Sequence, residues 1–128
     1  ISKAIRLNKE SKTLNNIHLY KNFSPNNYLV LINNSKCLIG NSSSGLREGA
    51  FLGIPVVNIG NRQQYRESSI NVKNVGHEAN EIYKAIINQA NHKKYPSSKH
   101  LGNGESGKLM CKVLNSINPP SIQKRLFY

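Results

Sequence analysis

The chain has 128 residues, which is enough for one domain with a modest hydrophobic core. Its formal net charge of +12 suggests a nucleic-acid partner, but the Lys and Arg residues occur in pairs at most and lack interleaved aromatic residues. A basic nucleic-acid-binding module is therefore a disfavoured alternative. No apolar run approaches the length of a membrane span and no signal-peptide pattern is present, so we expect a cytoplasmic protein without a membrane partner.

The cysteines and histidines give no sign of a metal site. Cys37 and Cys111 have neither metal-ligand nor redox-motif spacing, and we expect both to be buried thiols. The histidines are scattered and form no ligand pattern, so we predict structural or solvated roles for them, and neither a metal nor a cofactor. They are His18, His77, His92 and His100.

The first part of the chain predicts one strand and one helix. Residues 1–14 are polar and do not begin with Met, so we expect a partial leading segment and a chain that is a fragment. Residues 17–20 are a plausible strand. Ser24 and Pro25 form a good N-cap and first-turn pair for a helix that runs to about Asn34. Its apolar side, which should face the sheet, consists of Tyr28, Leu29, Leu31 and Ile32.

Two short apolar segments rich in β-branched residues predict buried strands of a parallel sheet. They are residues 37–39 and 55–59, and we expect both of their faces to be covered. Between them, residues 46–52 predict a short helix that ends at Gly53.

The second half of the chain continues the alternation. A polar loop over 61–69 precedes a strand over 70–75 with one exposed face. Amphipathic helices are predicted over 78–91 and 106–117, and Pro119-Pro120 stops the second. We expect the tail, 119–128, to pack on another domain. The predicted buried stripes are Ile82, Ala85, Ile86 and Ala90 in the first helix, and Leu109, Met110, Val113 and Leu114 in the second.

This alternation predicts an α/β fold, a Rossmann-like three-layer parallel sheet whose ligands bind outside the carboxyl ends of the strands. The turn over 40–45, Gly-Asn-Ser-Ser-Ser-Gly, lies at that edge. It matches neither the Walker loop nor the dinucleotide fingerprint. Two interpretations remain open at this point: a simple helix N-cap, or an anion site formed by hydroxyls and backbone N–H groups.

The residues around this turn carry a specific resemblance. The motifs are Gly-Asn-Ser-Ser-Ser-Gly-Leu-Arg-Glu over 40–48, Gly-Ile-Pro-Val-Val-Asn-Ile-Gly over 53–60, and the pairs Arg62-Gln63 and Arg66-Glu67. Tyr-Pro-Ser-Ser-Lys over 95–99 and Gly-Asn-Gly over 102–104 follow in the same order. Over about residues 15 to 128 the chain resembles the hydrolysing UDP-N-acetylglucosamine 2-epimerases. The resemblance implies that residues 15–118 are the UDP-binding, C-terminal Rossmann-like domain of a GT-B enzyme.

The resemblance also implies roles for individual residues. Ser42 and Ser43, together with the backbone N–H groups of Ser44 and Gly45, would hold the diphosphate, since hydroxyls and amides at a helix start are compact donors. N-capping by Ser43 or Ser44 is the structural alternative. Glu48 would accept two hydrogen bonds from the ribose diol, or it would compensate the helix dipole.

Three further residues have assigned roles. Tyr28 matches an aromatic position that packs on the uracil ring, although read alone it is a core residue. Arg62 is left open as a pyrophosphate ligand, and we expect Arg66 to brace the loop against Glu67. The family commonly has Gly where this loop carries Tyr65, a departure that would alter sugar specificity or simply reflect drift.

The implied reaction is UDP-N-acetylglucosamine plus water giving N-acetylmannosamine and UDP, in sialic-acid or related nonulosonate synthesis. The family's acid–base residues come mainly from a first domain absent here, so we assign no catalytic residue and expect the fragment alone to be inactive. The missing N-terminal catalytic domain is thus a predicted partner, and a homo-oligomer is expected of the whole enzyme. A GT-B glycosyltransferase is the enzymatic alternative; the Ser-rich turn and Arg62-Gln63 argue against it. The preferred acetamido sugar stays open.

Overall fold

The fold was analysed in a computed structural model, which describes residues 16–118. The expectations for residues 1–14 and for the tail 119–128, including Pro119-Pro120, lie outside the described residues. The chain divides into two compact units, Ile1–Leu31 and Ile32–Tyr128.

The described part of the first unit consists of an extended segment and most of helix α2 (Pro25–Asn33). The helix begins as predicted, because the Oγ of Ser24 accepts a hydrogen bond from the backbone N of Asn27 at 3.3 Å. The predicted strand over 17–20 is wrong: these residues are irregular and exposed. A strand needs ladder partners for its backbone groups, and no described strand pairs with this segment.

The second unit is built on a three-stranded parallel sheet in the order β1 (Leu38–Gly40), β2 (Val56–Ile59), β3 (Val72–Val75). Leu38 pairs with Val56, which in turn pairs with Val72. Between β1 and β2 lie two short helices, α3 (Ser43–Leu46) and α4 (Glu48–Leu52), instead of the single predicted helix over 46–52. The turn of helix thus starts earlier than predicted and is interrupted at Arg47, while its end at Gly53 is confirmed.

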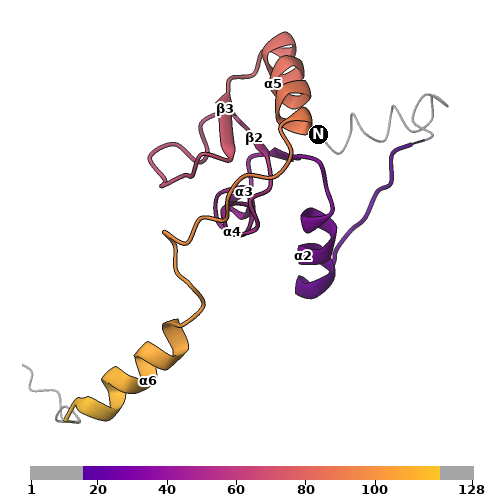
Figure 1. Cartoon of the computed structure of the whole chain (residues 1–128). Coiled ribbons are helices and arrows are strands. Elements are labelled where there is room, and N and C mark those ends of the chain that lie inside the picture. The colour runs from indigo at the N-terminus through magenta and orange to yellow at the C-terminus, as the bar shows by residue number, and fades with distance from the viewer. Residues whose placement is uncertain (1–15, 119–128) are drawn as a thin grey trace, which may run out of the picture. The chain divides into compact units, whose positions relative to one another are not determined.

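Helices cover both faces of the central strand. Val56 points toward α3 and α4, where an added Cβ on Gly45 would come within 2.8 Å of its Cγ1. Val57, the next residue, faces the other way and packs in a cluster with Val75 and Ala85 of helix α5 (Ala79–Asn91). Figure 1 shows α5 beside β2 and β3, and both strands contact it. The α/β class and the parallel sheet are therefore confirmed.

Burial differs from the prediction at several places. Val56 and Val57 are buried as expected, but Ile39 is exposed, and its strand, β1, is an edge strand of the described sheet. Ile70 precedes β3 instead of forming part of it and is exposed. In α2, Ile32 is buried, while Leu29 and Leu31 are exposed.

The two later helices behave differently from each other. In α5 the predicted stripe is confirmed: Ala85 is buried, its apolar neighbours are half-buried, and a polar residue, Gln89, joins them. Helix α6 (Ser106–Ser116) has no buried residue, so its predicted apolar stripe and Cys111 are exposed. The helix is amphipathic as predicted, but no described element packs on it. The buried position expected for Cys111 is therefore wrong, and Cys37 is half-buried.

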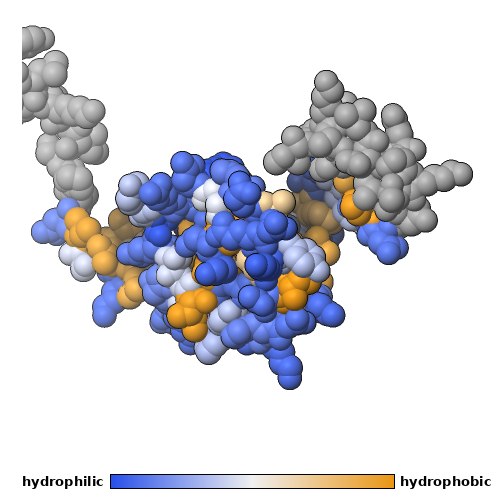
Figure 2. All heavy atoms as spheres, turned by 90° about the horizontal axis from the view of Figure 1, so that it is seen from above, coloured by the Kyte–Doolittle hydropathy of each residue, from blue (hydrophilic) through white to orange (hydrophobic). Residues whose placement is uncertain are grey.

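The described surface fits a strongly charged chain. Figure 2 shows one face that is mostly hydrophilic with separate apolar patches. Among residues 16–118, no helix is both long and apolar enough to cross a membrane.

Candidate functional site

The serine-rich turn is a local hydrogen-bonded structure that starts α3. Ser42 is the N-cap with extended backbone (φ −78°, ψ 143°), and its Oγ accepts a hydrogen bond from Ser44 N at 3.3 Å. The N–H of Gly45 donates to the carbonyl oxygen of Ser42, also at 3.3 Å. The cap is thus Ser42 and not Ser43 or Ser44 as expected, because the helix starts at Ser43, one residue earlier than a Ser43 cap requires and two earlier than a Ser44 cap requires.

Packing against the sheet requires glycine at position 45. Gly45 is buried, and its missing side chain lets α3 lie directly on Val56 of the central strand. The buried amide of Asn71 reinforces this packing, since its Nδ2 donates to Ile54 O at 2.9 Å and to Gly45 O at 3.4 Å. The carbonyl side of the turn is therefore fixed to the sheet, which holds the serine hydroxyls at the carboxyl end of β1.

The loop after β2 is tied to the same turn. The Nε2 of Gln63 donates to the backbone oxygen of Asn41 at 2.7 Å, across 22 positions of sequence. Within the loop, Gln64 N donates to Asn61 O at 2.9 Å and Arg66 N donates to Gln63 O at 3.1 Å. These bonds set the side chains of residues 61–66 at the carboxyl edge of the sheet, beside the serine turn.

A pocket of about 350 Å³ lies where the turn and the loop meet. The polar residues of its lining are Ser43, the two arginines Arg47 and Arg66, and one acidic residue, Glu67. Two cations and one anion give this pocket a net positive charge. Arginine binds phosphate oxygens in a bidentate fashion, so the lining favours a small anion such as a phosphate group.

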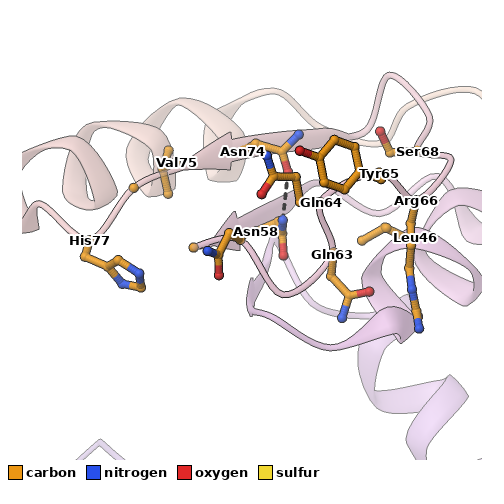
Figure 3. A pocket seen from close by; sticks show the side chains of 13 residues that line it. Leu46, Asn58, Gln63, Gln64, Tyr65, Arg66, Ser68, Asn74, Val75 and His77 are labelled. Atoms are coloured by element: carbon orange, nitrogen blue, oxygen red, sulfur yellow. Dashed lines mark hydrogen bonds between the residues drawn. The ribbon is translucent and has the colours of Figure 1, made fainter.

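A second pocket, of about 480 Å³, adjoins the first at the ends of β2 and β3. Leu46 and Arg66 line both pockets, and Figure 3 shows Arg66 at one end of the second pocket and His77 at the other. Asn58 and Asn74, which are paired in register, are joined by a hydrogen bond of 2.7 Å, dashed in Figure 3. The remaining residues of this lining are Gly60, Asn61, Gln63, Gln64, Tyr65, Ser68, Val75 and Gly76.

Tyr65 stands out in the second pocket. Its φ is 66°, in the left-handed region, and its side chain is 96% exposed. A bulky residue is rare in this conformation, which costs on the order of 1–3 kcal/mol. In Figure 3 its ring and the guanidinium of Arg66 point away from each other, so the two neighbours serve different parts of the site.

The predicted site residues are only partly brought together. Ser42, Ser43, Ser44 and Gly45 form one turn, and Ser43 lines the first pocket. Glu48 is exposed at the first position of α4, as its predicted place on the helix start requires. Arg62 is exposed and lines neither pocket. Tyr28 is half-buried on α2, within the other unit.

Other residues of the site were not assigned from the sequence. Arg47 lies inside the quoted motif, between α3 and α4, and a cation within a motif that resembles a diphosphate site was a usable signal. Asn58 is an amide within an otherwise apolar strand, which indicates a specific partner or ligand. Arg66 was expected to brace Glu67, but the only ion pair in residues 16–118 joins Lys108 to Glu105.

Residues 2–115 match the protein family described as UDP-N-acetylglucosamine 2-epimerase. The chain belongs to this family. A UDP-N-acetylglucosamine 2-epimerase of Neisseria meningitidis serogroup B is 29% identical over 103 residues, covering 77% of this chain. A hydrolysing UDP-N,N'-diacetylbacillosamine 2-epimerase of Legionella pneumophila is 31% identical over 101 residues, or 79% of this chain. In each case the chain spans 27% of the relative's length.

A third relative is named for a biosynthetic pathway and not for an epimerase activity. The polysialic acid biosynthesis protein P7 of Escherichia coli is 46% identical over 59 residues, which cover 46% of this chain and 15% of that protein. The resemblance of the serine turn and the following motifs to the epimerases is therefore confirmed by the family match.

Proposed function

We propose that this chain is the UDP-binding, C-terminal part of a hydrolysing epimerase that converts UDP-N-acetylglucosamine and water to N-acetylmannosamine and UDP. The observation that carries the proposal is the pocket at the carboxyl edge of the sheet where Ser43 meets Arg47 and Arg66. Open α/β sheets bind ligands at this edge. Membership of the epimerase family suggests UDP as the nucleotide, and the net positive charge of the pocket suits its diphosphate.

In this proposal the diphosphate lies against the serine turn. The hydroxyls of Ser42 and Ser43 donate to phosphate oxygens, and the guanidinium of Arg66 neutralises the charge that develops as UDP leaves. Gly45 contributes by keeping this turn close to the sheet. Arg62 is exposed and lines neither pocket, so Arg66 has the stronger support as the pyrophosphate ligand.

The nucleoside would be held by two further groups. Glu48, exposed at the start of α4, accepts hydrogen bonds from the ribose hydroxyls. Tyr28 would pack its ring against uracil. Both assignments rest on the sequence motif.

The acid and base of the reaction lie elsewhere in this proposal. General acid–base groups must be within hydrogen-bond reach of the sugar, and Glu67 is the only carboxylate in the lining of the two pockets. An N-terminal domain would supply the catalytic groups and complete a GT-B cleft. The exposed apolar residues of α6, including Leu109 and Leu114, and the tail 119–128 would pack on that domain.

Sialic-acid or nonulosonate synthesis is the proposed pathway class, and the name of the Escherichia coli relative supports it. The whole enzyme would be a cytoplasmic homo-oligomer. The test is to incubate the full-length protein with UDP-N-acetylglucosamine and follow UDP and N-acetylmannosamine. Formation of both in equal amounts is the expected result; transfer of the sugar to an acceptor without N-acetylmannosamine would instead indicate a glycosyltransferase.

A further inference from the structure

Two residues that line the second pocket, Asn58 and Gln63, each carry a buried oxygen atom that has no hydrogen-bond partner among the described residues. Gln63 is 6% exposed and Asn58 is 3% exposed. The Gln63 atom that contacts Asn41 O must be Nε2, because a backbone carbonyl only accepts. That leaves the Oε1 of Gln63 as an acceptor without a partner among the described residues. The Oδ1 of Asn58 is in the same situation, since the Nδ2 of Asn58 donates to Asn74.

Such acceptors are rare in folded proteins and unfavourable, because folding removes their water without replacing it. Both belong to residues that line the same pocket of about 480 Å³. Neither oxygen contacts solvent in the structure, but three other residues of the pocket lining, Asn61, Gln64 and Tyr65, are exposed. A small shift of this surface loop would let a ligand N–H or O–H reach the two oxygens.

Tyr65 gives the pocket an aromatic wall that the fold does not need. Its left-handed backbone is unfavourable, and its ring, 96% exposed, makes too little contact within the protein to offset the strain. Strain of this kind persists at ligand sites, where the side chain is held ready for a partner. An aromatic face beside hydrogen-bond acceptors suits a ligand with an apolar face and donors at its edge.

We propose that the pocket between Asn58, Gln63 and Tyr65 binds the sugar ring of the nucleotide sugar. Hydroxyl or amide N–H groups of the sugar donate to Gln63 Oε1 and Asn58 Oδ1, and the ring of Tyr65 covers its apolar face. This inference rests on the proposed function, which puts the diphosphate in the first pocket. The two pockets share Leu46 and Arg66, so one extended ligand can occupy both.

The test compares UDP with UDP-N-acetylglucosamine by calorimetric titration of the full-length protein and its Tyr65→Gly variant. Gly tolerates the left-handed backbone, so the variant keeps the fold and its midpoint of thermal unfolding does not fall. Its affinity for the sugar nucleotide should drop about fivefold or more, while its affinity for UDP stays within about twofold. Tyr83→Ala, which removes an exposed tyrosine of α5 outside both pockets, is the matched control and should change neither affinity.

A second variant, Asn58→Leu, removes the other unpartnered acceptor at similar volume and keeps the bond from Gln63 to Asn41 that supports the UDP site. It should again weaken the sugar nucleotide more than UDP, in protein whose circular dichroism shows that it is folded. Equal loss for both ligands in the two variants, or wild-type affinity of Tyr65→Gly for the sugar nucleotide, would overturn the sugar assignment and leave the UDP site standing. Failure of the wild type to bind UDP would overturn the proposed function itself, and the sugar assignment with it.

Discussion

Gln63 donates a hydrogen bond of 2.7 Å from its Nε2 to the backbone oxygen of Asn41 and so fastens the loop after β2 to the turn after β1. Because the amide is buried, water does not compete with this bond. The contact joins two ends of neighbouring parallel strands into one surface. It explains how Arg66, 23 positions after Ser43 in the printed sequence, lines the same pocket.

The two loop arginines should differ in their effect on nucleotide binding. Arg66→Ala should weaken UDP binding about tenfold or more, because a charge-assisted hydrogen bond contributes roughly 1.5–3 kcal/mol. Arg62→Ala, with the same charge change on a residue outside both pockets, should alter it less than about threefold. Titration of both variants with UDP at one ionic strength makes the comparison. An equal loss of UDP affinity in both variants would mean that Arg66 does not contact the nucleotide.

Gly53 should tolerate no side chain. Its φ is 66°, and a Cβ there would overlap the carbonyl oxygen of Tyr95, which is backbone and cannot rotate away. We expect Gly53→Ala to lower the free energy of unfolding by about 2 kcal/mol or more, measured by urea titration. Gly107→Ala is the control: it lies in α6 with open space around it, and it should be neutral or stabilising by up to about 1 kcal/mol.

Gln89 should be a stability determinant despite being polar. Its Nε2 donates to the carbonyl oxygens of Val56 and Asn71, and its Oε1 accepts from the Tyr95 hydroxyl at 2.7 Å. Gln89→Leu leaves these groups without their hydrogen-bond partner and should lower the free energy of unfolding in urea by about 2–4 kcal/mol. The double variant Gln89→Leu/Tyr95→Phe should lose less unfolding free energy than the sum of the two single losses, because both changes remove the same hydrogen bond. Strict additivity would contradict this network.

Cys37 makes stability depend on alkaline pH. Burial raises the pKa of its thiol above the ordinary value of 9.0, although a backbone hydrogen bond to Val57 opposes the rise. The fold therefore prefers the protonated thiol, and this contribution is complete below pH 9.0 and is lost as the pH rises through the folded pKa. Urea unfolding between about pH 8 and pH 10.5 should show a shallower decline in Cys37→Ala than in Cys111→Ser. Identical slopes would exclude the thiol as the cause.

The central strand, β2, was predictable because its apolar run is typical of a strand with both faces buried. Val56 and Val57 are buried on opposite faces, and Gly53 ends α4 with the left-handed backbone expected of a helix terminus. By contrast, the partner of Asn58 depends on the register that sets it opposite Asn74, and register is a property of the assembled sheet. The amide pair could not be found from sequence alone.

The candidate site was predictable to the level of its motif. The serine turn could be located from the sequence, but Ser42 became the cap because α3 starts at Ser43. Which arginine enters the pocket depends on the backbone of the 61–66 loop, including the left-handed Tyr65. In α6, periodicity predicts an apolar face but cannot indicate what covers it, which is why Leu109 was wrongly expected to be buried.

The most direct measurement is calorimetric titration of the full-length protein with UDP, compared with ADP, and repeated on Ser43→Ala and Glu48→Ala. The account predicts selective binding of UDP, weakened at least about fivefold in each variant because each loses one hydrogen-bonding group to the ligand. Lys73→Ala, on the exposed face of β3 and outside both pockets, should bind UDP as the wild type does. Equal affinity for UDP and ADP, or unchanged UDP binding in both site variants, would contradict the assignment of this edge of the sheet as the UDP site.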